Sequence, residues 1–176
     1  MAVIVKLSSP GPILYRQKRI GRFGREFSLW KFRSMFVNGD EILREHFKAN
    51  PEAKREWTES HKLRADPRIT GVGKIIRRAS LDELPQFINV LAGEMSLVGP
   101  RPIVSAEKAK YRDAYFFYAS AKPGLSGLWQ VSGRSDLSYG QRVALDEEYV
   151  RTWKITLDLK ILWRTAGAVW GSKGAV

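Results

Sequence analysis

The sequence predicts a single α+β domain that is mostly helical and has a β-hairpin near its N-terminus. Two strand-like runs enclose a glycine-bracketed turn at 21–24, and several later segments have the apolar spacing or the residue content of helices. The chain has 176 residues, contains no internal repeat and no linker-like stretch, and has the size of one domain. We therefore expect one domain over residues 1–176.

The hairpin is predicted from residues 9–35. The rigid turn SPGP is followed by ILYRQKRI, by the turn GRFG and by REFSLWKFRSM. In the second strand a period of two puts Lys31 and Arg33 on one face, and Trp30 and Phe32 on the other. We expect the aromatic face to pack and the basic face to offer positive charge.

Residues 40–79 are rich in charge. The stretch 40–63 is helix-prone, and Asn50-Pro51 breaks it into two short solvated helices, because the residue before a proline avoids the α region. A turn follows at Asp66-Pro67. The run after it, which ends at Arg77 and Arg78, is expected to be a solvated basic segment.

The second half of the chain is mostly helical in prediction. A first helix has an apolar face formed by Leu84, Phe87, Ile88 and Leu91, which we expect to pack on the core, and Gly93 is placed to end it. Further helices are predicted over 103–121 and 139–152, and from Thr156 as N-cap. Between them, the glycine- and serine-rich stretch 123–138 is expected to be a substrate-binding loop.

Charge and composition limit the partners. Thirty Lys and Arg against eighteen Asp and Glu give a net charge of +12, which favours nucleic acid, nucleotide phosphates or an anionic membrane surface. There is no cysteine and there are two histidines, so a metal would be a hard ion on oxygen ligands. No stretch reaches the roughly 18 apolar residues of a membrane-spanning helix. Six tryptophans among basic residues fit a membrane surface, and an ordinary basic soluble protein is the alternative.

Two adjacent carboxylates, Asp82 and Glu83, follow the basic pair Arg77 and Arg78 in the stretch SLDELPQFINVLAGEMSLVGPRP. The structural interpretation is a capping box from Ser80 to Glu83, although Pro85 indicates that the helix begins later. The functional interpretation is a phosphate site at a helix start. There, an ionised aspartate acts as nucleophile and a neighbouring glutamate helps to hold magnesium.

Three long segments of the chain resemble the bacterial sugar transferases, small monotopic phosphoglycosyl transferases. They read SSPGPILYRQKRIGRFGREFSLWKFRSM, DPRITGVGKIIRRASLDELPQFINVLAGEMSLVGPRP and KPGLSGLWQVSGRSDLSYGQRVALDEEYVRTWKITLDLKILWRT. The resemblance implies transfer of a sugar 1-phosphate from a UDP-sugar to polyprenyl (undecaprenyl) phosphate, with release of UMP. This reaction begins the assembly of exopolysaccharide, capsule or O-antigen. The resemblance does not identify the sugar.

The resemblance also implies roles for particular residues. Asp82 is similar to the nucleophile that forms an aspartyl-phosphosugar intermediate, and Glu83 to the catalytic ligand of Mg²⁺. Positions near the substrate phosphates match Lys31, Arg77 and Arg101, and an acidic position near the site matches Asp158. Gln130 and Arg134 lie in a loop that touches nucleotide or sugar, without an assigned role.

One departure from the family concerns the membrane. The family has an apolar re-entrant helix before the SPGP turn, of which AVIVKL matches the last residues. We expect amphipathic membrane-interface helices, and a location at the cytoplasmic face of the bacterial inner membrane as a monotopic or peripheral protein. The rival interpretations are a nucleic-acid-binding module and an inactive membrane-associated scaffold; we expect no nucleic-acid partner. Monomer and homodimer stay open.

Overall fold

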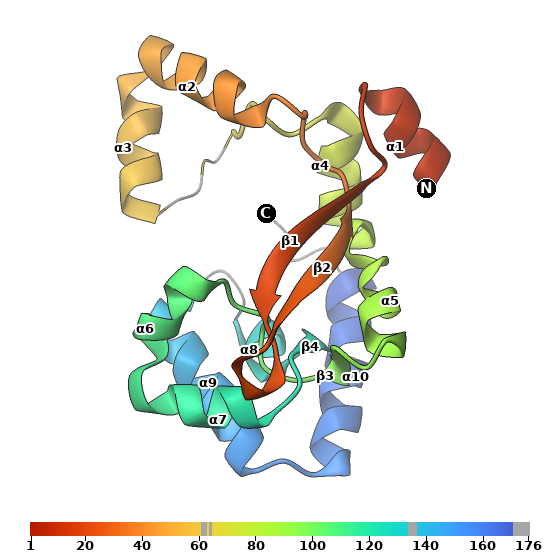
Figure 1. The fold of residues 1–176 in the computed structure, drawn as a ribbon, viewed down its shortest axis with the longest axis vertical. Helices are drawn as coiled ribbons and strands as arrows, with labels where there is room; N and C mark the ends of the chain where they lie inside the picture. The colour runs from red at the N-terminus through yellow and green to blue at the C-terminus, as the bar shows by residue number, and fades with distance from the viewer. Residues whose placement is uncertain (61–62, 64, 134–136, 171–176) are drawn as a thin grey trace. The chain divides into compact units, whose positions relative to one another are not determined.

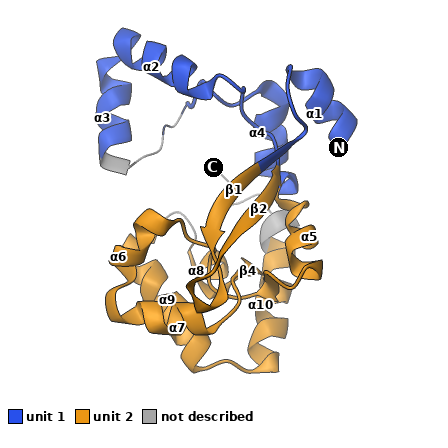
Figure 2. Ribbon diagram, in the orientation of Figure 1, with its two compact units in different colours: residues 1–15, 32–82, 176 blue, residues 16–31, 83–175 orange. Residues whose placement is uncertain are grey.

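The computed structural model describes residues 1–60, 63, 65–133 and 137–170 (Figure 1). Helices dominate, and two small two-stranded sheets accompany them, which confirms the predicted α+β class. The chain forms two compact units, drawn in blue and orange in Figure 2. The first unit contains 1–15 and 32–82, and the second contains 16–31 and 83–175.

The predicted N-terminal hairpin is confirmed. Strand β1 (Leu14–Ile20) pairs with β2 (Glu26–Phe32), and the single 3-10 turn η1 (Arg22–Gly24) joins them. Phe23 and Gly24 both have positive φ in this turn. The glycine bracket read from the sequence therefore marks the point where the chain reverses.

The expected burial of the two β2 faces is wrong. Phe27 and Leu29 share the face of Lys31 and are buried against Met95, so this face packs. On the other face Trp30 is half-buried, and Arg16 lies 4.6 Å above its ring centroid. Phe27 and Leu29 lie four and two positions before Lys31, on the same face of the strand. Burial of these apolar side chains makes this the face that packs on the core. Lys31 consequently emerges at the edge of a core cluster.

Arg33 also does not present its positive charge to solvent, contrary to the expectation. It is buried in the first unit, where its guanidinium donates to the carbonyls of Ser9, Pro10 and Pro12 and to the Ser9 hydroxyl at 2.7 to 2.9 Å. A buried guanidinium is tolerated when its donors are satisfied in this way. Arg33 therefore fixes the SPGP turn instead of facing solvent.

Helices make up most of the first unit. They are α1 (Ala2–Ser8), α2 (Gly39–Ala49), α3 (Pro51–Ser60) and α4 (Gly71–Arg78). The predicted break at Asn50-Pro51 is confirmed. Helices α2 and α3 share a small core of Leu43, Ala53 and Leu63.

Helix α4 was not predicted, since the sequence analysis expects a solvated basic segment there. Thr70 is its N-cap, and its side chain accepts a 2.8 Å hydrogen bond from the N–H of Gly73. Ile76 is buried and Ile75 is exposed. The N-cap threonine and the apolar residues after it are a helix signal that the basic residues hid.

The second unit holds the remaining elements. They are α5 (Gln86–Leu91), β3 (Ser96–Val98), η3 (Ser105–Glu107), α6 (Lys108–Tyr111), η4 (Arg112–Ala114), α7 (Tyr115–Ser120), β4 (Gly124–Ser126), α8 (Leu128–Ser132), α9 (Tyr139–Arg151) and α10 (Ile155–Trp170). Strands β3 and β4 pair in parallel, Ser96 with Gly124 and Val98 with Ser126. The helix predicted over 139–152 is confirmed as α9. The segment predicted as helix over 103–121 is helical only in part, because it is divided among η3, α6, η4 and α7, with φ +47° at Arg112. The last helix, α10, begins at Ile155, so Thr156 lies inside it and is not its N-cap.

The expected loop at 123–138 is partly wrong, because β4 and α8 lie within it. The glycines that suggested a loop serve close backbone contacts instead. A Cβ on Gly124 would lie 2.1 Å from the backbone nitrogen of Gly99, and one on Gly127 would lie 2.3 Å from the Gly99 carbonyl oxygen. The role of these glycines is to let the backbones of β3 and β4 approach closely, and not to make the segment flexible.

Helix α5 is oriented opposite to expectation. Its apolar side chains, predicted to pack on the core, are exposed, and Leu91 reaches 88%. Gln86 and Asn89 are the buried residues. The helix ends at Leu91 and Gly93 follows with φ +76°, as predicted. Polar side chains with fixed partners hold the inner face, so the apolar stripe faces outward.

Asn89 explains this orientation and yields a first prediction. It is fully buried; its amide donates to the Ser28 carbonyl (2.8 Å) and to Glu94 (2.6 Å), and its oxygen accepts from the Trp30 N–H (3.1 Å). Because Asn89→Ala leaves buried backbone groups of β2 unpaired, we expect the free energy of unfolding to fall by about 3 kcal/mol. Urea denaturation measures this.

The matched control is Asn38→Ala. Asn38 is an exposed N-cap residue of α2 whose side chain makes no capping hydrogen bond. We expect a change below about 0.5 kcal/mol there. Equal losses in the two variants would contradict the role assigned to Asn89.

Candidate active site

A polar pocket in the second unit brings together several predicted site residues. The hairpin, the turn before α5, the segment after β3, and the β4–α8 region all contribute to it. Its lining consists of Arg19, Leu29, Lys31, Glu83, Gln86, Arg101, Pro102, Gly124, Leu125 and Gln130. Three of these side chains are cationic and one is acidic, so the pocket suits an anionic ligand.

Lys31 and Glu83 form the closest charged pair of this pocket. Lys31 Nζ lies 2.6 Å from Glu83 Oε1, and the Glu83 side chain is 36% exposed. Burial opposes ionisation of Glu83. The Lys31 ammonium, with smaller contributions from Arg101 and Gln86, outweighs it and holds the pKa of the Glu83 carboxyl below its ordinary value. The carboxylate is therefore ionised at neutral pH.

The turn that carries the two carboxylates is not a capping box. Ser80 has φ +56°, residues Leu81–Glu83 form the 3-10 turn η2, and α5 begins later, at Gln86. Ser80 and Glu83 are consequently not the N-cap and third residue of α5. The later helix start, which Pro85 indicated, is confirmed, and Glu83 is left at the pocket.

Arg101 projects from a rigid backbone segment between Pro100 and Pro102. Its guanidinium lies 5.4 Å from the ring centroid of Trp129, a cation–π geometry. Arg19 donates from Nη1 to the Pro102 carbonyl at 3.1 Å. The sequence analysis missed Arg19, because nothing distinguishes it from the other basic residues of β1 until the fold brings it to Pro102.

Asp82 and Arg77 belong to the first unit. Asp82 is buried and directly precedes Glu83, and Arg77 lies in the last turn of α4. Successive positions of one tight turn carry the two carboxylates. The grouping of Asp82 and Arg77 with the pocket stays a prediction.

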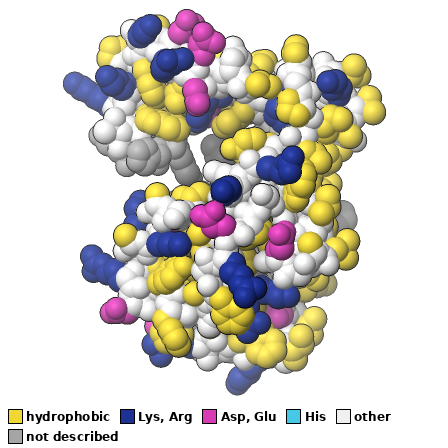
Figure 3. Space-filling view, in the orientation of Figure 1, with side chains coloured by type: hydrophobic (Ala, Val, Ile, Leu, Met, Phe, Trp, Pro, Cys, Tyr) yellow, Lys and Arg dark blue, Asp and Glu magenta, His cyan; other side chains and the backbone are white. Residues whose placement is uncertain are grey.

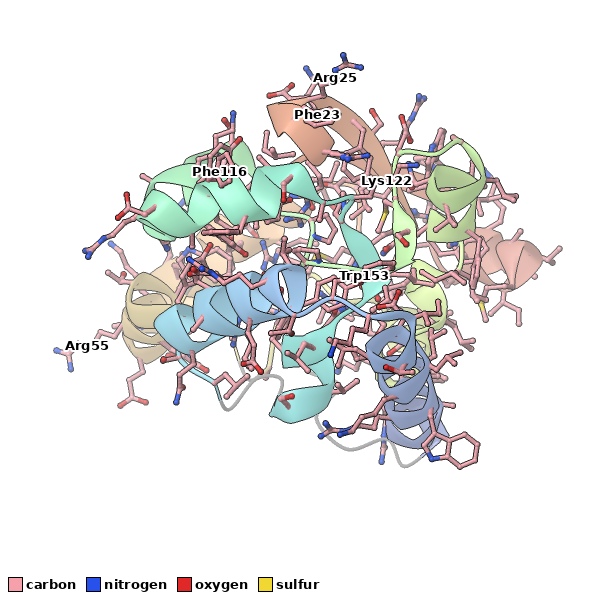
Figure 4. The ribbon with its side chains drawn as sticks, turned by 90° about the horizontal axis from the view of Figure 1, so that it is seen from below. Phe23, Arg25, Arg55, Phe116, Lys122 and Trp153 are labelled. Carbon is pink, nitrogen blue, oxygen red and sulfur yellow. The ribbon has the colours of Figure 1, made fainter. Side chains whose placement is uncertain are left out.

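Asp158 is held in place but does not line this pocket. Its carboxylate accepts from the Tyr149 hydroxyl (2.8 Å) and from Trp153 Nε1 (3.1 Å). Trp153 lies on the connection from α9 to α10 (Figure 4). Gln130 lines the pocket and donates to the Leu125 carbonyl. Arg134 lies outside the described residues.

A magnesium ion fits this site only together with a substrate. Within the described ranges, no group of three or more acidic or histidine side chains could hold a metal. Magnesium commonly takes one or two carboxylates and completes its octahedron with waters and substrate phosphates. The single ionised carboxylate of Glu83 meets that pattern. The described residues do not supply enough ligands to hold magnesium by protein groups alone.

Comparison with known proteins identifies the family to which the chain belongs. The family model described as "Bacterial sugar transferase" matches residues 1–172. Exopolysaccharide production protein ExoY of Sinorhizobium fredii is 51% identical over 172 residues, covering 98% of this chain and 76% of that protein. The undecaprenyl-phosphate galactose phosphotransferase of Salmonella typhimurium is 52% identical over 165 residues, covering 94% of this chain and 35% of that protein.

A third relative is the UDP-glucose:undecaprenyl-phosphate glucose-1-phosphate transferase of Escherichia coli. It is 42% identical over 174 residues, covering 94% of this chain and 34% of that protein. The chain therefore belongs to the bacterial sugar transferase family, and the resemblance read from its motifs is confirmed. The two relatives named for undecaprenyl phosphate are about three times as long as this chain.

Proposed function

We propose that this chain is a phosphoglycosyl transferase that moves a sugar 1-phosphate from a UDP-sugar to polyprenyl phosphate. The observation that carries the proposal is the pocket lined by Arg19, Lys31, Arg101 and an ionised Glu83, the residue after Asp82, with Lys31 paired to Glu83. A cationic pocket suits the donor diphosphate. Names of relatives supply the substrate class.

In the proposed first step, the Asp82 carboxylate attacks the sugar-linked phosphorus of the donor. A new O–P bond forms, the bond from that phosphorus to the bridging oxygen breaks, and UMP leaves with the electron pair. Lys31 and Arg101 stabilise the charge that develops on the phosphoryl oxygens. The enzyme is left as an aspartyl-phosphosugar.

In the proposed second step, a phosphate oxygen of the polyprenyl phosphate attacks the same phosphorus. The aspartyl O–P bond breaks, Asp82 is regenerated as a carboxylate, and the product is a polyprenyl diphosphate sugar. Magnesium held by Glu83 and the phosphate oxygens would offset the repulsion between anionic nucleophile and anionic substrate. Two half-reactions allow a soluble donor and a lipid acceptor to use one site in turn, so ping-pong kinetics are expected.

The test is incubation with a panel of UDP-sugars and magnesium, without lipid, followed by intact mass measurement. The proposal expects a phosphosugar adduct with at least one donor and its discharge when polyprenyl phosphate is added. A folded protein that forms no adduct with any donor and releases no UMP would contradict the proposal. Such a result would favour the nucleic-acid module or the inactive scaffold.

We also propose that the chain works at the cytoplasmic surface of the bacterial inner membrane. Among the described helices, none has both the length and the apolar content needed to cross a bilayer. Both units expose apolar helical side chains, namely Val3, Ile4, Leu7, Phe87, Ile88, Leu91, Leu159 and Trp163. Figure 3 shows such side chains interspersed with Lys and Arg, and Figure 4 shows Phe23 and Phe116 near the surface of the second unit. This mixture suits an anionic lipid surface.

Vesicle binding tests the membrane proposal. Leu91→Ser removes an 88% exposed leucine from α5 and should weaken partitioning onto phosphatidylglycerol-containing vesicles about thirtyfold, because burying a leucine is worth about 2 kcal/mol. The control is Val37→Ser, an exposed apolar residue before α2. Cosedimentation that is the same for both variants and the parent protein would contradict α5 as a lipid-contacting face.

A further inference from the structure

The Arg101 guanidinium has an aromatic partner instead of an acidic one. Its side chain is exposed, and within the part of the chain that the structure describes the guanidinium makes no hydrogen bond and no ion pair. The ring of Trp129 lies beside it, with the ring centroid 5.4 Å from the guanidinium carbon. An exposed guanidinium on a long flexible stem otherwise samples many positions. The Trp129 ring therefore limits where the charge of Arg101 lies.

An aromatic partner leaves the guanidinium available to a ligand. Arg68 in the first unit shows the contrast, because Asp66 accepts from its Nε and Nη2 at 2.6 to 3.1 Å. A carboxylate in that position occupies the donors and offsets the charge. An aromatic ring attracts a cation through the negative potential of its face and does not take up the N–H groups in this way. Arg101 thus keeps the donors that bind phosphate oxygens in pairs.

Trp129 is buried but is not part of a hydrophobic cluster. The residue is 5% exposed, and it belongs to none of the clusters that the described residues form. Leu128 and Val131 of the same helix pack on the cluster around Ile161. The indole N–H of Trp129 is buried and has no acceptor among the described residues. A second guanidinium, that of Arg142 on α9, lies 5.0 Å from the ring centroid. Contacts with two cations therefore distinguish this tryptophan from the core residues of α8.

We propose that Trp129 is a positioning residue whose ring holds the Arg101 guanidinium where it binds the donor diphosphate, and leaves the N–H groups of that arginine to the phosphate oxygens. The inference rests on the proposed function. Helix α8 connects the ring to the pocket, because Gln130, the next residue, lines the pocket together with Arg101. Arg142 is not one of the lining residues, so its contact affects the ring and not the ligand.

The experiment measures the Kd for UDP by calorimetry in magnesium buffer, together with thermal unfolding. We expect Trp129→Leu to weaken the Kd about fivefold to thirtyfold, the change that corresponds to the loss of one cation–π contact. Trp129→Phe keeps an aromatic face and should weaken the Kd less than about threefold. In an Arg101→Ala background, Trp129→Leu should change the Kd less than about twofold, because the group that the ring positions is gone.

The matched control is Trp57→Leu. Trp57 makes the same kind of contact with Arg68, whose guanidinium carbon lies 4.7 Å from the ring centroid. Neither residue is among those that line the pocket. The control substitution should leave the Kd for UDP unchanged.

A second series of variants keeps the test independent of folding. Tryptophans with increasing numbers of fluorine atoms, incorporated at position 129, keep the shape of the ring and weaken its attraction for a cation stepwise. We expect the affinity for UDP to fall along the series while the thermal midpoint stays constant. A residue with a purely structural role would not show this dependence.

The outcomes separate the two hypotheses. A parent protein that does not bind UDP contradicts the proposed function, and the inference about Trp129 fails with it. A parent protein that binds UDP, with an equal loss of affinity from Trp129→Leu in both backgrounds, overturns the positioning role alone. So does an affinity for UDP that is the same throughout the fluorinated series.

Discussion

Asp82→Asn should abolish formation of the phosphosugar adduct and lower kcat/KM for sugar phosphate transfer by about 10³-fold or more, the scale expected when a covalent nucleophile is removed. The amide has nearly the shape of the carboxylate, but it carries no charge and is a poor nucleophile towards phosphorus. Intact mass shows the adduct, and transfer of labelled sugar phosphate into the lipid fraction gives the rate.

Two controls make the Asp82 result specific. Asp113→Asn makes the same chemical change at an exposed aspartate and should keep full activity. Thermal unfolding of Asp82→Asn should be close to that of the parent protein, so that the loss is chemical. An adduct of unchanged yield in Asp82→Asn would rule out Asp82 as the nucleophile and redirect the search to other carboxylates, with Asp158 first.

The hairpin was predictable because its signals are local. Alternating residues and the glycines at 21–24 fix strands and turn without reference to the rest of the chain. Which face of the hairpin is buried could not be predicted from local signals, because the burial depends on packing against Met95, which is distant in sequence. The same limit applies to Arg33: its charge is evident in the sequence, whereas the three carbonyls that bury it depend on the path of the SPGP turn.

Helix α5 shows a second limit. Its apolar spacing correctly predicted a helix and its end, but an apolar stripe indicates only that a face favours leaving water and not what covers it. The buried Asn89 decides the orientation through hydrogen bonds to β2. At a lipid surface, where we propose that this chain works, an apolar stripe on a helix can face lipid instead of the core.

Site residues could be predicted from the sequence where they stand in an unusual local pattern. They could not be predicted where they look like the other charged residues of the chain. Adjacent carboxylates in a basic stretch drew attention to Asp82 and Glu83, and the family resemblance drew attention to Arg101. The structure places Glu83 and Arg101 in one pocket, whereas the role of Asp82 stays a prediction. Arg19 resembles the other basic residues of the chain. Only the fold shows that Arg19 donates to the Pro102 carbonyl.

Replacement of Lys31 by methionine should lower kcat/KM at pH 8 by about 10²-fold and should also move the acid limb of the pH profile to higher pH. The first effect follows from the loss of a cation at the phosphoryl oxygens. The second follows from the pKa of Glu83, which Lys31 holds below its ordinary value against the effect of burial. Without Lys31 burial acts more strongly, the pKa of Glu83 rises, and protonation inactivates the site at a higher pH.

Lys18→Met is the matched control, since Lys18 lies on β1 with its side chain 82% exposed. It should change neither the rate nor the pH profile. Glu83→Gln separates the causes further, because a glutamine does not titrate. That variant should lose activity, require more magnesium and lack the acid limb assigned to Glu83. If the limb persists unchanged in Glu83→Gln, another group, such as a substrate phosphate, titrates there; the shift in Lys31→Met would then have to come from that group instead of Glu83.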